Sequence, residues 1–337
     1  MNHRLLFPAW FGMLLTTVLI SLTLGRYPVT LPEIYGYLAQ TLLNQGKLTE
    51  QHLQTLRTIL FDIRMPRIMA AILVGSALSV SGAAFQSMFI NPLVSPGLLG
   101  VLAGASFGAA LGMVVSKSWL AVQAGAFGFG LAAVAVALGL ARLYQGDRLL
   151  LLVMGGIISG ALFTALLSVI KYMADPYDQL PAIVYWLLGG LAMVNGQTVL
   201  VVSLPIICGI SLLLVLSRYL NVLTMGDEEA RSLGVNVTVL RLVFIITATL
   251  ISSLTVALAG IIGWVGLVIP HMGRMLVGPD NRILLPVVTI MGAVFLVVVD
   301  DISRLLFQVE IPLGILTSLL GVPVFALILK NARKGWG

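Results

Sequence analysis

The sequence is dominated by long apolar runs that carry almost no charge. A helix needs about 20 such residues to cross the roughly 30 Å hydrocarbon core of a bilayer. Nine runs come close to this length or exceed it, at residues 5–24, 68–90, 93–116, 118–141, 149–170, 179–217, 242–270, 283–299 and 311–329. We therefore expect an all-α, polytopic membrane protein, because only helices satisfy their own backbone hydrogen bonds in such apolar segments.

The composition excludes a soluble class of protein. Of the 337 residues 59% are hydrophobic and only 9% are charged, whereas soluble domains average about 25% charged residues. The mean hydropathy is +1.07. The net charge of +6 lies in short loops between the runs, so it reports membrane topology, and we expect lipid rather than nucleic acid as a partner.

Two of the runs are longer than one crossing requires. The run 242–270 contains Gly260, Gly263 and Gly266, and we interpret it as one full crossing followed by a short returning helix. About ten transmembrane helices then result. Splitting the run 179–217 is the less favoured alternative; it keeps the number of crossings even but moves some loops to the other side of the membrane.

An even number of crossings puts both termini on one side, and the distribution of basic residues indicates which side. The short loops on the outer side hold only Lys117, Lys171 and Arg304. The inner side receives Arg4, Arg142, Arg148, Arg218, Arg231, Arg241, Arg274, Arg282, Lys330, Arg333 and Lys334. We therefore expect a multi-pass protein of the bacterial inner membrane with both termini in the cytoplasm.

No segment between the runs is long enough for a soluble domain, so residues 1–337 are expected to form a single transmembrane domain. The longest polar segment is 25–67. Within it, the helical spacing of apolar residues after Pro32 predicts a short amphipathic helix on the outer surface. Cys208 is the only cysteine and lies inside an apolar run, which excludes a disulfide framework.

The chain has no motif for an energy source of its own. A phosphate-binding loop of the form G-x-x-x-x-G-K-[ST] is missing from the sequence. Ion-coupled carriers usually keep carboxylates or histidines inside the bundle, whereas the thirteen acids lie at the ends of runs or in loops, including Asp175, Asp300, Asp301 and Glu310. We therefore expect a partner to supply the energy; an ion-coupled secondary transporter without an ATPase is the alternative. A channel filter motif and a catalytic or metal-binding set are missing as well.

The segment from Met225 to Gly234 is the best candidate for a contact with that partner. Three acids stand at its start and a glycine at its end, which are start and stop signals of a helix. The pattern predicts a short exposed helix on the cytoplasmic side. From spacing alone, a solvated loop helix without a binding role is the more probable interpretation.

The order of residues in several segments resembles the FecCD-type permease family, the membrane subunits of ABC importers for iron-siderophores, haem and cobalamin. The resemblance covers nearly the whole chain. The segments that carry it are 64–67, 82–86, 91–100, 186–190, 226–234, 265–274, 278–282 and 311–314. The chain departs from the family pattern at residues 260–264, where proline and phenylalanine are common in the family.

The resemblance implies a ten-helix permease with the type II ABC importer fold that works as a homodimer. It implies two cytoplasmic ATP-binding subunits, which bind ATP and Mg, and a periplasmic substrate-binding protein, so this chain would hold no cofactor and no metal and would not be an enzyme. Cargo would cross at the dimer interface by ATP-driven alternating access. The cargo class is a metal chelate or a metal oxyanion, with molybdate or tungstate as the specific candidate.

The resemblance also implies roles for particular residues. The ATPase-coupling segment is Gly226, Asp227, Glu228, Glu229, Ala230, Arg231, Ser232, Leu233 and Gly234. The residues that dock the binding protein are Arg64, Arg67 and Arg304, whose planar guanidinium groups suit glutamate partners. The translocation path is expected along Gly155, Gly156, Ser159, Thr164 and Ser168, although helix packing explains these small residues nearly as well. The inner gate is expected at Gly146 and Asp147.

Overall fold

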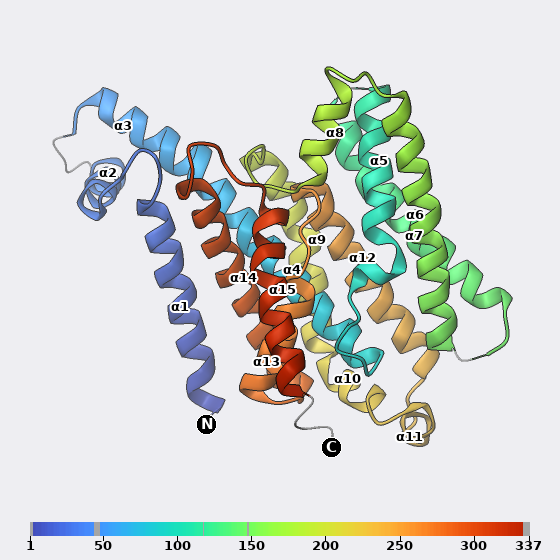
Figure 1. Cartoon of the computed structure of the whole chain (residues 1–337). Helices are drawn as coiled ribbons and strands as arrows, with labels where there is room; N and C mark the ends of the chain where they lie inside the picture. The colour runs from blue at the N-terminus through green and yellow to red at the C-terminus, as the bar shows by residue number, and fades with distance from the viewer. Residues whose placement is uncertain (1–2, 44–47, 117, 147, 333–337) are drawn as a thin grey trace.

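The computed structural model describes residues 3–43, 48–116, 118–146 and 148–332, and within these ranges it is a bundle of helices without β-strands (Figure 1). The helices that run across the bundle are α1 (His3–Thr23), α4 (Met65–Met88), α5 (Val101–Val115), α6 (Trp119–Leu143), α7 (Arg148–Met173), α9 (Gly196–Val215), α12 (Val237–Ala259), α13 (Val265–Val277), α14 (Asn281–Leu305) and α15 (Leu313–Ala332). Shorter helices lie at its ends: α2 (Leu31–Leu43), α3 (Glu50–Arg57), a π-helix (Thr58–Arg64), a 3-10 helix (Pro96–Leu99), α8 (Gln179–Leu187), α10 (Ser217–Leu223) and α11 (Asp227–Ser232).

The polytopic all-α architecture is confirmed. In the described part of the chain, six helices are long and apolar enough to cross a membrane, and four further helices contain shorter apolar stretches of 10–17 residues, at Phe7–Thr23, Val101–Val115, Val265–Val277 and Leu313–Leu327. Of these four helices, α5 and α13 are only 15 and 13 residues long, below the length of about 20 residues that a perpendicular crossing needs. The count of ten crossings therefore stays a prediction.

Both overlong runs are interrupted by glycine. In the first, α12 ends at Ala259 and α13 begins at Val265, after Gly260 takes a φ of +67°; the predicted break is confirmed. In the second, α8 covers only nine residues before the chain turns at Gly189, with a φ of +70°. At 1.5 Å per residue α8 cannot cross a bilayer, so this run is one long helix preceded by a short one.

The prediction of a crossing that begins at residue 93 is wrong. The Asn91 side chain accepts a hydrogen bond from the Leu93 backbone N–H at 2.9 Å, which closes a turn instead of a helix. A short 3-10 helix follows, and Gly100 takes a left-handed φ of +84° before α5 begins. Asparagine and proline near the start of this segment thus shorten the helix at that end.

Helix α4 lies in the middle of the bundle (Figure 1) and is buried along most of its length. Its glycines permit very close approach of neighbouring helices. A Cβ on Gly82 would lie 1.9 Å from the Gly266 carbonyl oxygen of α13, and one on Gly75 would lie 2.1 Å from the Gly292 carbonyl oxygen of α14. Such small-residue contacts hold helices together where lipid provides no hydrophobic driving force between them.

The predicted surface helix after Pro32 is present as α2. It packs on α3 and the π-helix through a small apolar cluster of Val29, Tyr37, Leu56 and Leu60. Thr30 and Glu33 form a capping box at its start, since Thr30 donates from both its backbone N–H and its hydroxyl to Glu33 Oε2 at 2.7 Å. These hydrogen bonds, the backbone one foremost, hold the pKa of Glu33 below its ordinary value.

Asp280 caps the start of α14. Its Oδ1 accepts from the Arg282 backbone N–H at 3.0 Å, and the Arg282 guanidinium donates to Oδ2 at 3.1 Å. Hydrogen bonds from the Arg282 side chain, and then from Asn221, lower the pKa of Asp280 to about 2 from an ordinary 3.8. The carboxylate is therefore ionised at every physiological pH.

We expect this cap to contribute a small acid-sensitive part of the stability. Because the folded pKa is depressed, ionised Asp280 stabilises the fold fully above pH 3.8, and the contribution is lost as the pH falls toward 2. The Arg282 side chain is 67% exposed, so salt also weakens the effect. Thermal unfolding of the wild type and of Asp280→Asn at pH 6 and pH 3 should show a gap that narrows in acid. An unchanged gap would contradict this assignment.

Candidate functional site

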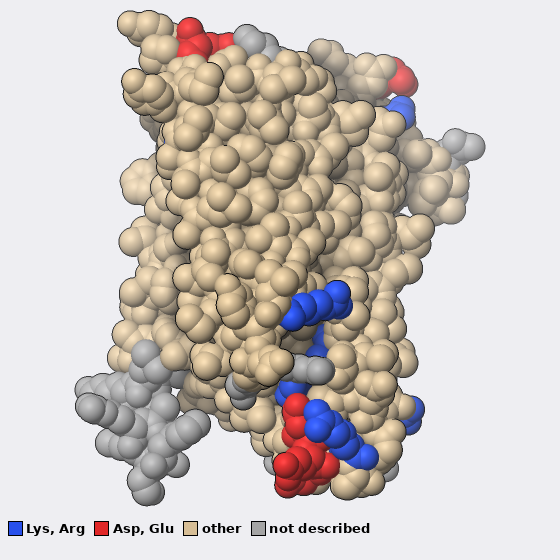
Figure 2. All heavy atoms as spheres, turned by 90° about the vertical axis from the view of Figure 1, so that its right-hand side faces the viewer, with Lys and Arg blue, Asp and Glu red and all other residues tan. Residues whose placement is uncertain are grey.

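The predicted coupling segment forms α11, and α10 precedes it on the same side of the bundle. In Figure 1, α11 lies at the same end as the first and last described helical residues, whereas α2, α3 and α8 lie at the opposite end. We call these the α11 end and the α2 end. Figure 2 shows an acidic group beside basic side chains at the α11 end, separated from the charged residues of the α2 end by a broad uncharged band.

Glycines set both limits of α11. Gly226 has a φ of +110° and precedes the helix, and Gly234 has a φ of +78° and follows it. The end is closed by hydrogen bonds from Gly234 N to Arg231 O at 2.9 Å and from Val235 N to Ala230 O at 3.1 Å, which is a Schellman arrangement. The predicted short helix is confirmed, and its two boundaries follow from the two glycines.

One face of α11 is fixed to the bundle and the other is exposed. Ala230 is completely buried, and the carboxylate of Asp227 pairs with Arg241 of α12 through two hydrogen bonds of 2.6 and 3.0 Å. Glu228, Glu229, Arg231, Ser232 and Leu233 are exposed. Asp227 therefore anchors the helix, and the pair Glu228 and Glu229 is left to meet a partner.

A buried ion cluster lies at the α2 end, near the end of α14. Arg67 pairs with Asp300 through Nε and Oδ2 at 2.9 Å, and with Glu310 through Nη1 and Oε2 at 2.9 Å. Arg304 contacts Asp300 through Nε and Oδ2 at 3.3 Å and also pairs with Asp301. Asp301 in turn accepts from the Ser21 hydroxyl at 2.7 Å. The two aspartates are thus neutralised by two arginines.

This cluster corrects the expectation that all thirteen acids lie at the ends of runs or in loops. Asp300 and Asp301 lie within α14 and are 1% and 7% exposed; the apolar run ends before them, but the helix does not. Arg67 of α4, which pairs with Asp300, lies 233 residues away in the sequence, so no local pattern could show that pairing. The sequence signals were the spacings of Arg304 from Asp301 by three residues and from Asp300 by four, which place these side chains on one face of a helix.

The three arginines predicted to dock a binding protein lie together at the α2 end, but their side chains point into the chain. Arg64, Arg67 and Arg304 are at most 9% exposed. Arg64 donates to the carbonyl oxygens of Leu22 and Tyr27. Their docking role stays a prediction, and in this conformation each guanidinium already has partners within the chain.

The five residues predicted to line the path lie on different faces of α7. A Cβ on Gly155 would lie 2.5 Å from the Ala137 carbonyl oxygen, and one on Gly156 would lie 2.1 Å from that of Leu98. Ser159 is fully buried and donates to the Ala133 carbonyl oxygen at 2.7 Å. These three pack against the chain's own helices. Thr164 and Ser168 are exposed, so the prediction that α7 lines a path rests on them alone.

Two substitutions in α7 distinguish residues that pack against neighbouring helices from residues that line a path. Ser159→Ala should lower the free energy of unfolding by about 1 kcal/mol, because the Ala133 carbonyl loses a buried hydrogen bond, while transport stays unchanged. Thr164→Ala should leave stability unchanged, because its side chain is exposed. Thermal unfolding and uptake are measured on both variants. Loss of transport in Ser159→Ala at unchanged stability would restore that residue to the path.

The structure describes one of the two residues that were predicted to form the inner gate. Asp147 lies outside the described residues. Gly146 takes a φ of +152° and lines a cavity of about 500 Å³ at the α11 end, together with Arg142, Asp227 and Arg241. The segment predicted to gate the path therefore borders the ion pair that anchors α11.

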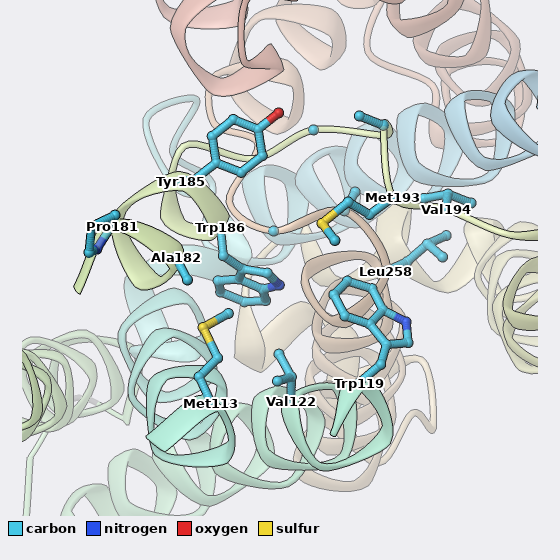
Figure 3. Close-up of a pocket in the computed structure, with 14 residues that line it drawn as sticks. Met113, Trp119, Val122, Pro181, Ala182, Tyr185, Trp186, Met193, Val194 and Leu258 are labelled. Carbon is cyan, nitrogen blue, oxygen red and sulfur yellow. The ribbon is translucent and has the colours of Figure 1, made fainter. Parts of the chain in front are cut away.

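A larger, apolar cavity of about 660 Å³ opens at the α2 end (Figure 3). Trp119, Trp186, Tyr185, Met113 and Met193 face into it. Its wall includes the turn that follows α8 and the turn that follows α12. A hydrogen bond from Gly190 N to Ala259 O at 2.8 Å joins these two turns. The lining has no charged side chain among the described residues, so its chemistry suits apolar or aromatic groups.

Sequence comparisons agree with the motifs. The FecCD transport family matches residues 13–331. The chain is 36% identical over 325 residues to the molybdate import system permease protein of Haemophilus influenzae, covering 96% of this chain and 94% of that one. It is 39% identical over 283 residues to the hemin transport system permease protein of Yersinia pestis, covering 82% and 84% of the two chains. It is 35% identical over 328 residues to the vitamin B12 import system permease protein of Klebsiella pneumoniae, covering 95% and 92%.

Solved structures agree as well. A metal-chelate type ABC transporter in an inward-facing conformation superposes with a TM-score of 0.85 at 36% identity, covering 97% of this chain and 99% of that one. A second structure, from Streptococcus pneumoniae, has a TM-score of 0.59 at 16% identity and supports the fold alone. Family match, whole-length relatives and fold all agree, and the chain belongs to the FecCD transport family of ABC importer permeases.

Proposed function

We propose that this chain is the single-domain transmembrane permease subunit of a binding-protein-dependent ABC importer in the bacterial inner membrane. Two copies would form the path, two cytoplasmic subunits would bind ATP and Mg at their own sites, and a periplasmic protein would deliver cargo to the α2 end. The α11 end, with both termini, would face the cytoplasm. ATP-driven alternating access of the two copies would move the cargo inward.

The observation that carries this proposal is the form of α11. Glu228 and Glu229 are exposed on a short helix whose other side is held by Asp227 and the fully buried Ala230. A small acidic surface on a fixed base suits contact with a basic cleft on a moving partner, because charge complementarity sets register and orientation. A loop helix without a partner has no need of such an attachment.

An ion-coupled carrier is the rival, and the buried carboxylates bear on it. Carriers use buried acids that gain and lose an ion or proton during transport. Here Asp300 and Asp301 are held by Arg67 and Arg304, so a permanent positive charge already neutralises each carboxylate. This arrangement favours a structural role and gives the rival no support.

For the cargo we propose a metal chelate or metal oxyanion, with molybdate or tungstate as the specific candidate. The relative that imports molybdate matches this chain over 96% of its length, and the similar solved structure is of metal-chelate type. Relatives for haemin and vitamin B12 have comparable identities, 39% and 35%, and selection would belong to the binding protein. Mass spectrometry of the ligand retained by the binding protein encoded beside this chain tests the candidate; a siderophore or corrinoid would replace it.

Reconstitution tests the class of transporter. The chain is purified with its ATPase and binding protein, placed in liposomes, and assayed for uptake of labelled molybdate and tungstate. We expect uptake only when Mg-ATP is present on the side of the membrane that carries the ATPase and when the binding protein is present. Accumulation by the isolated chain under a proton or sodium gradient, with no ATPase, would instead establish the carrier.

A further inference from the structure

A hydrogen-bonded node joins α10 to the start of α14 at the α11 end. Asn281 is 1% exposed, and its backbone N–H and side-chain amide both donate to Asn221 Oδ1, at 2.9 and 2.8 Å. The Asn221 amide donates in return to Asp280 Oδ1 at 2.6 Å. One side chain of α10 thus makes three hydrogen bonds to the turn between α13 and α14.

The node continues into the centre of the bundle. The Ser87 hydroxyl, at the end of α4, donates to Asn281 Oδ1 at 2.7 Å. Arg274 of α13 donates to Ser87 Oγ at 3.4 Å and also to Gln86 Oε1. The chain of contacts therefore runs from α10 through α14 to α4 and α13, which are the helices whose glycines pack closest.

The position of Asn221 in the chain connects the node to α11. It lies six residues before Asp227, so α10 leads directly into α11. Apolar packing already holds α10 in place, because Leu220 and Leu223 are completely buried. The polar bonds are therefore not needed simply to keep α10 folded; they fix its rotation and register against one particular turn.

The second attachment of α11 is weaker. Asp227 pairs with Arg241 of α12, but the aspartate side chain is 36% exposed, and partly exposed ion pairs are screened by water and salt. A displacement of α11 along the membrane normal would reach α4, α13 and α14 through the more shielded α10 node, in which each Asn281 amide group has a partner.

We propose that Asn221 is a positioning residue for energy coupling, which delivers movement of α11 to the α13–α14 turn and from there to α4. This rests on the proposed function, in which an ATPase moves α11. Without the node, α10 would still be folded and α11 would still bind the ATPase, but part of the movement would be lost in rotation of α10.

The first test uses Asn221→Ala in the complete transporter, reconstituted with ATPase and binding protein. We expect the ATPase to copurify and to hydrolyse ATP at the wild-type rate, while cargo transported per ATP falls about three- to tenfold. The matched control is Asn195→Ala, which removes one side-chain hydrogen bond, from Thr198 N at 2.8 Å, at the opposite end of the bundle. It should leave the ratio of transport to hydrolysis unchanged.

A rescue experiment separates positioning from general damage. Asn221→Asp places a second carboxylate beside Asp280 and should reduce coupling. Adding Asp280→Asn lets the new amide donate to the new carboxylate, which also accepts from Asn281, so the double variant should recover most of the wild-type ratio. The new amide nitrogen takes the place of Asp280 Oδ1, which also accepts from the Arg282 backbone N–H, so the double variant should still melt at a lower temperature than the wild type. Melting temperatures of all variants are measured in the same detergent, and coupling should follow the pairing rather than the melting temperature.

Failure of this inference is distinct from failure of the proposed function. If wild-type transporter couples ATP to uptake and Asn221→Ala does so equally well, Asn221 has no positioning role. The same follows if the double variant stays as uncoupled as Asn221→Asp. If wild-type uptake does not depend on the ATPase at all, the proposed function fails, whatever the variants do.

Discussion

A transporter with Glu228→Lys and Glu229→Lys should hydrolyse ATP without importing cargo. Both side chains are exposed on α11 and make no ion pair within the described residues, so the fold loses no ion pair when they change. The basic surface expected on the ATPase would face two lysines instead of two glutamates. Like charges brought together in this way cost several kcal/mol, which is enough to release the helix from its cleft.

The measurement compares uptake, ATP hydrolysis and copurification of the ATPase for this variant and the wild type. Glu228→Gln with Glu229→Gln is the matched control, since it removes the charge without reversing it and should give an intermediate loss. Melting temperatures should agree within about a degree, because surface substitutions of this kind change stability by less than about 0.5 kcal/mol. Wild-type transport in the lysine variant would remove the coupling assignment.

The short helix α11 could be predicted from sequence because its determinants are local; its coupling role stays a proposal. Gly226, the three acids and Gly234 are contiguous, and each acts on its own turn of the backbone. The break near Gly260 was also predictable, since several glycines interrupt one run. The surface helix α2 followed from Pro32 and the spacing after it. At these places, residues that are close together in the sequence determine the structure.

Long-range contacts were not predictable in the same way. The residues 155, 156 and 159 are small, and small residues suit both a pore lining and a helix contact; only the positions of α6 and the 3-10 helix show that they face inward. Asn221 gave no signal at all, because its partners lie 59 and 60 residues away. The type of a side chain indicates which interactions it can make, but the fold decides which residue lies beside it.

The buried ion cluster gives the other large expected effect. Asp300→Ala removes the carboxylate that faces both Arg67 and Arg304, and its side chain is only 2% exposed. Removing one member of a buried pair costs about 3–5 kcal/mol, because the remaining charge is left without a partner. We expect the low end of this range, since Arg67 keeps Glu310 and Arg304 keeps Asp301.

Glu310→Ala is the matched control, because it removes an acid from the same arginine at a site that is 31% exposed. Water can solvate the guanidinium there, so the cost should be about 1 kcal/mol or less. The double variant leaves Arg67 with no acid and should therefore lose more than the sum of the two single changes. Thermal unfolding of the purified chain in detergent measures all three. Equal losses in the two single variants would mean that water reaches Asp300 and that the cluster is not sealed within the bundle.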